Sequence, residues 1–197
     1  MRSISIHKIA LVGLAAILLI PLAFGETPVD TSKNLDFSAL NFVLQDLLTY
    51  SGDDSPVLIK DSPPNELIFA PNAATWPQTV DAVLYRQEEK PWARLTAAQQ
   101  ILVQEAASNL VMRANSTNSF ASFKPVDSRI RLFTDETTPD VFGRPIRAWP
   151  PGYSDDNSIA VVRLSIPWSI HHADGTYILA RSDTGWTILL RQFVYYV

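Results

Sequence analysis

The sequence contains no cysteine among its 197 residues. Disulfides, thiol chemistry and the lipidated cysteine of an anchored lipoprotein are therefore excluded. Glycine is scarce as well: the seven glycines are scattered, so the chain has neither a P-loop nor a glycine-rich dinucleotide fingerprint. The motif G-x-S-x-G is missing, and S-x-x-K does not occur after the first 25 residues. The sequence patterns of two common classes of enzyme with a serine nucleophile are therefore absent.

Runs of lysine or arginine are also missing. The first 25 residues contribute two of the 16 basic residues and none of the 20 acidic ones, so the remainder carries a formal charge of −6. A mildly acidic chain without a basic cluster is a poor match for nucleic acid or for an anionic membrane surface. We therefore expect neither of them as a partner.

The first residues have the pattern of a signal peptide. A basic head with Arg2 and Lys8 precedes an uncharged apolar run over residues 9–24, and Ala23 and Gly25 are small, as a cleavage site requires. The run is 16 residues long, whereas a membrane-spanning helix needs about 20. We predict cleavage of residues 1–25 and a secreted or periplasmic protein, and a retained anchor is the alternative.

The remaining 172 residues suffice for one domain. After a polar linker over residues 26–33, the segment 34–50 has apolar residues at helical spacing. Residues 78–89 are expected to form a short helix. A longer one is predicted after Thr96, where Gln99 completes a capping box. The predicted apolar face of that helix consists of Ala98, Leu102, Ala106 and Leu110, and it is broadened by Ile101 and Val103.

After residue 125 the apolar pattern changes from helical to alternating, which predicts three strands within residues 158–197. Along residues 158–170 one face is apolar and the other carries Arg163, as in a half-buried strand. The last strand is apolar on both faces, which indicates a central strand or one covered on both sides. The links "HADG" and "SDTG" both end in glycine and are predicted turns.

These patterns predict one α+β domain over residues 34–197, with N-terminal helices packed on one face of a C-terminal twisted antiparallel meander. The segment with Tyr177, the turn "SDTG" and the strand "WTILLRQF" resembles the closing strands of NTF2-like domains. The resemblance covers about 40 residues and implies a cone-shaped α+β fold with a pocket between helices and sheet. It does not select a function, because that fold hosts enzymes, ligand binders and adaptor domains.

His171 and His172 are the only histidines after the leader. Either could act as a general base if Asp174 or another carboxylate oriented it, giving an acid–base enzyme. The alternative is that the two histidines and Asp174 form the corner of a hairpin, with Asp174-Gly175 in the turn. Neighbouring strand residues point to opposite faces, so the pair is unsuited to bind one metal ion. We expect no metal and no cofactor.

Arginines and aromatic residues gather in the same region. Every basic residue after position 125 is an arginine, and an arginine can bind a carboxylate or phosphate through two parallel hydrogen bonds. The alternative is that these arginines pair with nearby acidic residues. Residues 148–157 are a candidate recognition loop or a plain connector. The candidate ligand-binding residues are Trp149, Tyr153, Arg163, Trp168 and Tyr177.

We therefore predict an exported, soluble binding domain for a small anionic or aromatic molecule or for a protein. Its binding site is expected in the cleft between helices and sheet. The alternative is the acid–base enzyme that uses His171 or His172.

Overall fold

The computed structural model describes the following residues: 31–51, 57–60, 80, 83–84, 92–114, 120, 122–133, 145–168 and 171–196. The chain divides into two units, Met1–Asp30 and Thr31–Val197, and all described elements belong to the second. The predicted signal peptide, residues 1–25, lies outside the described residues. No helix in the described part of the chain is long and apolar enough to cross a membrane.

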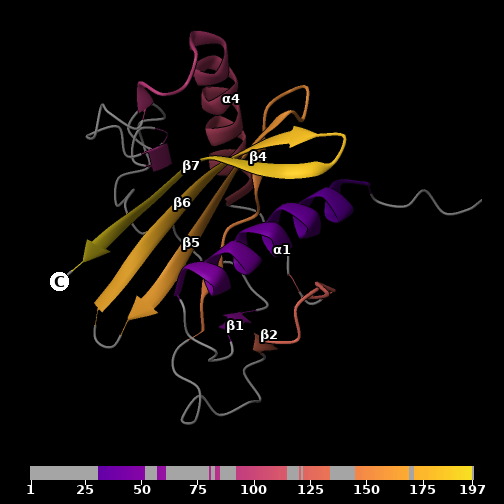
Figure 1. The fold of residues 1–197 in the computed structure, drawn as a ribbon, viewed down its shortest axis with the longest axis vertical. Helices are drawn as coiled ribbons and strands as arrows, with labels where there is room; N and C mark the ends of the chain where they lie inside the picture. The colour runs from indigo at the N-terminus through magenta and orange to yellow at the C-terminus, as the bar shows by residue number, and fades with distance from the viewer. Residues whose placement is uncertain are drawn as a thin grey trace, which may run out of the picture. The chain divides into compact units, whose positions relative to one another are not determined.

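Helices precede the large sheet along the chain, as the sequence predicts (Figure 1). The helices are α1 (Thr31–Ser51) and α4 (Ala97–Ala114). The short strands are β1 (Val57–Lys60), β2 (Ile130–Phe133), β3 (Arg147–Ala148) and β4 (Gly152–Tyr153). The long strands are β5 (Ile159–Trp168), β6 (His171–Ser182) and β7 (Gly185–Tyr196). The predicted α+β class is confirmed.

The first helix begins at Thr31, before the predicted start at residue 34. The capping box before α4 is present: the backbone N–H of Thr96 donates to Gln99 Oε1 at 2.9 Å, and that of Gln99 donates to Thr96 Oγ1 at 3.2 Å. Most of the helix predicted over residues 78–89 lies outside the described residues; Val80, Val83 and Leu84 are helical.

The five-stranded sheet has the order β3-β5-β6-β7, and β4 also pairs with β5. Strands β5, β6 and β7 form the predicted antiparallel meander. A separate parallel pair, β1 and β2, is joined to the large sheet by a bridge between Ile59 and Ile146. The β1–β2 pair therefore lies next to the large sheet, at the end where β3 begins.

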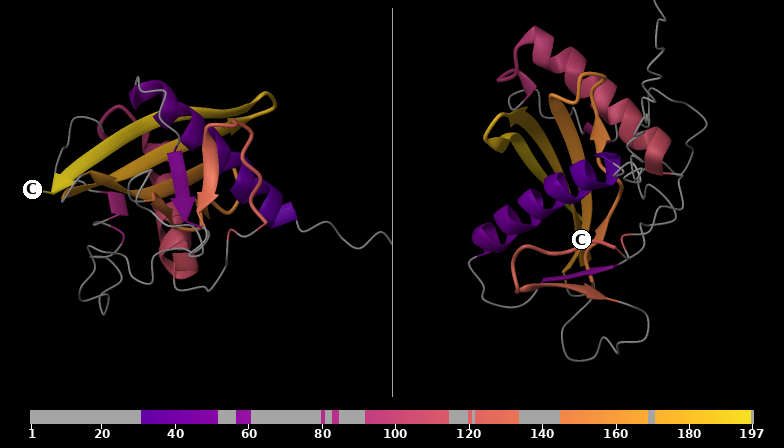
Figure 2. Two further views of the ribbon diagram at one scale, coloured as in Figure 1. Left: turned by 90° about the horizontal axis from the view of Figure 1, so that it is seen from below. Right: turned by 90° about the vertical axis from the view of Figure 1, so that its right-hand side faces the viewer.

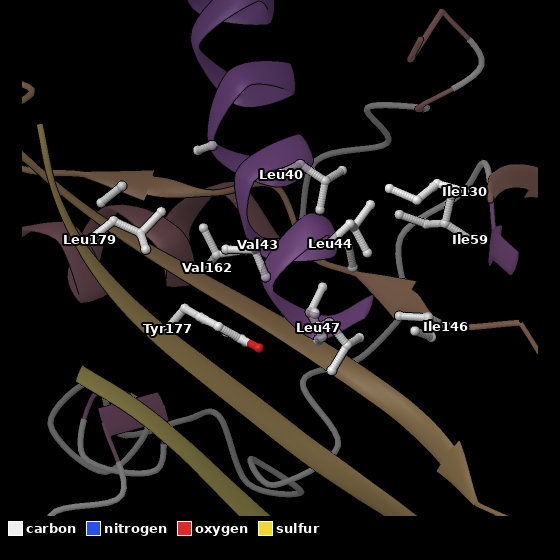
Figure 3. Packing of buried hydrophobic residues seen from close by; sticks show 14 of the residues in the cluster. Leu40, Val43, Leu44, Leu47, Ile59, Ile130, Ile146, Val162, Tyr177 and Leu179 are labelled. Carbon is white, nitrogen blue, oxygen red and sulfur yellow. The ribbon is translucent and has the colours of Figure 1, made fainter. Parts of the chain in front are cut away.

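The two long helices lie on opposite faces of the large sheet, so the prediction that helices cover one face is wrong. Leu40, Val43 and Leu44 of α1 pack with Val162 and Tyr177 (Figure 3). Val161 and Ile178, which alternate with them, belong to the other cluster with α4. Figure 2 shows two further views of this layering. Strand β5 is therefore buried on both faces rather than half-buried.

The packed face of α4 agrees with the prediction in part. Its buried residues are Val103, Ala106, Ala107, Leu110, Val111 and Ala114. Of the predicted face, Ala98 and Ile101 are exposed and Leu102 is half-buried. The contact with β4 lies on the shared part of the face: a Cβ at Gly152 would lie 2.6 Å from Leu110 Cβ and would also collide with the Ala106 carbonyl. The backbone of β4 therefore touches the helix directly.

The turn predicted at residues 172–175 is wrong, because these residues lie inside β6. Trp168 pairs with His171, so the chain reverses between them, and Asp174 pairs with Ser165. Gly175 lies beneath the ring of Phe193, where a Cβ would be 2.9 Å from Cε1. The second predicted turn is correct: Ser182 pairs with Gly185, whose φ is +120°.

The burial of side chains tests two further expectations, one about the last strand and one about the predicted recognition loop. β7 is the last strand in the sheet order, so it is not central, but its side chains pack on both faces: Phe193 against the α1 cluster and Leu190 against the α4 cluster. Residues 148–154 are buried and include β4 and part of β3, so they are not an exposed recognition loop. Only residues 155–157 of the predicted loop are exposed.

Candidate functional site

A pocket of about 620 Å³ lies where four parts of the chain meet. The first turns of α1, the end of α4, the β4–β5 connection and the β6–β7 hairpin each contribute to its wall. Such a volume is typical of pockets for small organic molecules. The residues that line it are Asn34, Leu35, Ser38, Arg113, Tyr153, Asn157, Arg181, Ser182, Asp183, Gly185 and Trp186.

Two aromatic rings and two guanidinium groups form a continuous row along this wall. Arg113 lies over the Tyr153 ring at 5.6 Å, and the Tyr153 and Trp186 ring centroids are 6.3 Å apart. Arg181 lies over the Trp186 ring at 5.9 Å. Cations at these distances from an aromatic face are attracted by its quadrupole. The row therefore has flat apolar surface in its middle and one cation at each end.

The cation at the α4 end is already neutralised. Arg113 Nη1 donates to Asp36 Oδ1 at 3.0 Å, and Arg113 Nη2 donates to Asp36 Oδ2 at 2.6 Å. Arg113 also donates to the Pro151 carbonyl. Burial acts to lower the pKa of Arg113, but the hydrogen bond and charge of Asp36 outweigh it and the pKa is raised. The bidentate pair thus fixes the guanidinium and cancels its charge.

The two rings of the row are fixed by the helices on either side. Trp186 Nε1 donates to Ser38 Oγ of α1 at 3.1 Å, and the backbone N–H of Tyr153 donates to Asn109 Oδ1 of α4 at 3.1 Å. Burial, together with the charge of Asp36, raises the pKa of the Tyr153 phenol, so the ring stays neutral. The pocket therefore has a preformed aromatic wall with no charge of its own.

The cation at the hairpin end differs from Arg113. Arg181 is exposed, and within the described part of the chain it forms no ion pair. Its backbone N–H donates to the Ser158 carbonyl at 2.8 Å, which joins the hairpin to the β4–β5 connection. Its guanidinium lies against the Trp186 ring. Its hydrogen-bond donors can therefore be offered to a molecule in the pocket.

No family model, curated protein or solved structure matches this chain. The NTF2-like resemblance of the closing strands accordingly stays a prediction. What the protein does has to be argued from the side chains of the site.

Of the four candidate ligand-binding residues whose side chains the structure describes, Tyr153 lines the pocket and the other three do not. Trp149 and Tyr177 are fully buried, and Arg163 is 3% exposed. Tyr177 packs with α1, whereas Arg163 alternates with Val162 and therefore lies on the opposite face of the sheet. These residues could not share one cleft. The backbone of Trp168 ends β5, and its side chain lies outside the described structure.

Arg163 belongs to a buried polar network rather than to a binding site. Arg163 Nη2 donates to Asp174 Oδ2 at 2.9 Å, and Nη1 donates to the Val83 carbonyl at 3.0 Å. Thr176 Oγ1 donates to the same carbonyl at 3.2 Å. The guanidinium also lies 5.9 Å from the centre of the Trp149 ring. The network attaches the segment at Val83 to the sheet.

This network includes Asp174, one of the three predicted catalytic residues. Asp174 is 1% exposed and paired with Arg163, so it is not an accessible carboxylate at a hairpin corner. The backbones of His171 and His172 open β6, but their side chains lie outside the described residues, and their catalytic role stays untested. Among the described residues, no group of three or more histidine, aspartate or glutamate side chains could hold a metal ion.

Sequence reasoning missed most of the pocket. Arg181 and Trp186 stand immediately outside the turn "SDTG", and their positions on either side of a predicted hairpin were a usable signal. Arg181 pairs with Trp186 across the strands. By contrast, Asn34, Ser38 and Arg113 are distant in sequence, and only the packing of α1 and α4 brings them to the hairpin.

Proposed function

We propose that this chain is an exported, non-catalytic domain that binds a small anionic molecule in the pocket between α1, the end of α4 and the β6–β7 hairpin. The observation that carries the proposal is Arg181. It is an exposed guanidinium on the pocket wall without an ion pair among the described residues, next to a fixed aromatic surface. A planar fork of donors suits a carboxylate or phosphate.

Among the arginines, the distribution of ion pairs identifies Arg181 as the residue available to an anion. Most described arginines near the sheet are paired with carboxylates: Arg163 with Asp174, Arg191 with Asp46 and Arg113 with Asp36. In each pair the two charges cancel, so none of these arginines offers a net charge to a ligand. Arg181 is different because its charge faces the pocket, and a charged group in a half-enclosed site attracts a complementary ligand more strongly than one in open water.

The aromatic wall adds a preference for ligands with a flat or apolar part. Trp186 and Tyr153 lie side by side at the pocket surface, and Leu35 of α1 lines the same space. Burying apolar ligand surface there stabilises the complex by about 25 cal/mol per Å² removed from water. An anion with an apolar body would therefore use both halves of the wall.

Calorimetric titration with benzoate and phenylphosphonate tests the proposal, with benzyl alcohol as the uncharged control. The wild-type protein should bind the two anions and not the alcohol. Arg181→Gln should weaken anion binding about tenfold, since a hydrogen bond to a charged group is lost. Arg131→Gln is the matched control, because Arg131 is exposed on β2 and lies outside the pocket. Equal affinity of Arg181→Gln and wild type would overturn the proposal.

Export is the part of the proposal that rests on residues 1–25, with their basic head, apolar run and small residues. Full-length protein made in a secreting host should be recovered outside the cytoplasm with Glu26 as its first residue. N-terminal sequencing of the purified protein provides the measurement. Recovery of the intact chain from the membrane fraction would instead support a retained anchor.

A further inference from the structure

The pocket contains a second charge that a simple anion would not use. Asp183 lines the pocket beside Arg181, is exposed, and within the described structure forms no ion pair with Arg181 or with any other residue. Because Asp36 neutralises Arg113, Arg181 and Asp183 are the two uncompensated charges of the wall. One is positive and one is negative, and both belong to the same hairpin.

We propose that the ligand of this pocket is a zwitterion, a free α-amino acid whose carboxylate binds Arg181 and whose ammonium group binds Asp183. The inference rests on the anion-binding function proposed above and names the class of molecule. A simple anion satisfies Arg181 but is repelled by Asp183, and a simple cation has the opposite defect. A molecule that carries both charges satisfies both residues at once.

The spacing of the two residues fits this class. Arg181 and Asp183 are two positions apart on the hairpin, so their Cα atoms are at most about 7 Å apart even in a fully extended chain. In an α-amino acid the ammonium and carboxylate groups are attached to one carbon atom. Arg181 and Asp183 lie close together on one hairpin and line the same pocket, so their flexible side chains can reach the two charged groups of so small a ligand.

The hairpin turn fixes the backbone that carries these two residues before a ligand arrives. Ser182 Oγ donates to the Gly185 carbonyl at 3.2 Å, and its distance to Thr184 Oγ1 is 3.0 Å. Gly185 adopts a φ of +120°, which a residue with a side chain rarely does. A turn fixed in this way loses little conformational freedom when the ligand binds.

The side chain of the amino acid would lie against the remaining apolar surface. Trp186 and Tyr153 continue the wall from Arg181, and Leu35 faces the same space from α1. These residues match an aromatic or branched aliphatic side chain. Polar side chains would have no charged partner there, because Asp36 already occupies Arg113.

The experiment compares amino acids with the same molecules lacking one charge. Phenylalanine and leucine are titrated calorimetrically alongside hydrocinnamate and 4-methylpentanoate, which lack the amine, and phenethylamine, which lacks the carboxylate. At least one amino acid should bind at least about fivefold more tightly than its deaminated counterpart, the upper range for one exposed ion pair. Asp183→Asn should abolish that difference, whereas Asp155→Asn, which alters an exposed carboxylate outside the pocket, should preserve it.

The outcomes separate this inference from the proposed function. If acids without an amine bind through Arg181 as tightly as both amino acids, the zwitterion proposal is wrong and the anion site stands. The same holds if the preference for the amino acid survives Asp183→Asn. If no carboxylate binds, or if Arg181→Gln has no effect on any probe, both proposals are wrong. Binding of phenethylamine alone, dependent on Asp183, would also overturn both.

Discussion

Gly152 occupies a position in β4 where no side chain fits. A Cβ there would lie 2.6 Å from Leu110 Cβ and would collide with the backbone of α4. Backbone atoms of a helix cannot move aside as the end of a flexible side chain can. We expect Gly152→Ala to lower the free energy of unfolding by about 3 kcal/mol or more, the upper part of the range for overpacking. Urea titration followed by circular dichroism measures the loss.

Gly175→Ala is the graded control for this prediction. The nearest atoms to a Cβ at Gly175 belong to the ring of Phe193, at 2.9 Å and 3.1 Å. That ring is half-buried and can shift, so the expected loss is smaller, about 1 kcal/mol. If Gly175→Ala proved more damaging than Gly152→Ala, the direct contact between β4 and α4 would be wrong.

Asp156 stabilises the connection between β4 and β5 in a pH-dependent way. Its carboxylate accepts hydrogen bonds from the Ser154 hydroxyl at 2.7 Å and from the Ser158 hydroxyl and backbone N–H at 2.7 Å and 2.9 Å. These bonds lower the pKa of Asp156 from 3.8 to about 2. Because the pKa is lowered in the folded state, the stabilisation is complete above the unfolded value and is lost as the pH falls through about 2.

Asp156→Asn should therefore be less stable than wild type at about pH 5, and the difference should shrink toward about pH 2. Denaturant midpoints at the two pH values give the comparison. Asp155→Asn serves as the control, because Asp155 is the neighbouring exposed carboxylate and makes none of these hydrogen bonds. A difference between wild type and Asp156→Asn that stayed constant with pH would contradict the assignment.

At the scale of elements, the Arg163–Asp174 pair joins β5 to β6 inside the protein. The exposed side-chain fractions are 4% and 1%. Removing one partner leaves a buried charge without its counterion, which costs about 3–5 kcal/mol. We expect Arg163→Met and Asp174→Asn each to cause such a loss of unfolding free energy. The double variant should lose clearly less than the sum, because neither orphan charge remains.

Equilibrium unfolding of the two single variants and the double variant forms the cycle that measures the pair. Losses that simply add would mean that the two side chains do not interact energetically. Where a single variant fails to fold, recovery of folding in the double variant gives the same information. Asp127→Asn is a useful reference, since Asp127 and Arg129 form an ion pair that is only partly buried and joins residues two positions apart in the sequence.

The misplaced turn shows why strand boundaries were only partly predictable. Asp174-Gly175 has the composition of a turn, and locally nothing distinguishes it from one. In the fold, Arg163 neutralises Asp174, and Phe193 covers Gly175. Both compensations come from neighbouring strands, so they do not exist in the local sequence. The turn at residues 182–185 was predictable because its stabilising contacts are local: Ser182 bonds within the turn itself.

The candidate site was less predictable than the strands for a similar reason. The alternation in β5 and the capping box at Thr96 are local signals, and the strand and the helix start that they predict are both present, although β5 is buried on both faces rather than half-buried. The pocket is assembled from elements more than 100 residues apart, so its wall depends on how α1 meets the hairpin, as in the bond from Trp186 to Ser38. Arg163 looked accessible because sequence alternation gives the face of a strand but not what covers it.

At the scale of the whole described domain, α1 is tied to other elements by two ion pairs. Asp36 near its start pairs with Arg113 of α4, and Asp46 near its end pairs with Arg191 of β7, each at 2.6 Å. Both pairs hold the same helix, and the first is bidentate. Only the first borders the pocket, because Arg113 lines it whereas Asp46 and Arg191 do not.

This arrangement allows stability and binding to be separated. Arg113→Gln removes the first pair and leaves the Asp36 carboxylate uncompensated behind the pocket wall, where it repels an anion. Arg191→Gln removes the second pair at a distance from the pocket. We expect both to lower the free energy of unfolding, by about 1–2 kcal/mol for each pair. Arg113→Gln alone should also weaken benzoate binding severalfold, as measured by calorimetry at low salt, and added salt should reduce that effect.

The contrast between the two variants decides whether the charge balance of the pocket matters. If benzoate affinity falls equally in both, the loss reflects general loosening of α1, because Asp46 is too far along the helix to act on Arg181 directly. If neither variant changes affinity, Asp36 and Arg113 do not influence the site. A loss confined to Arg113→Gln shows that the neutral Asp36–Arg113 pair leaves the choice of ligand to the hairpin charges, Arg181 and Asp183.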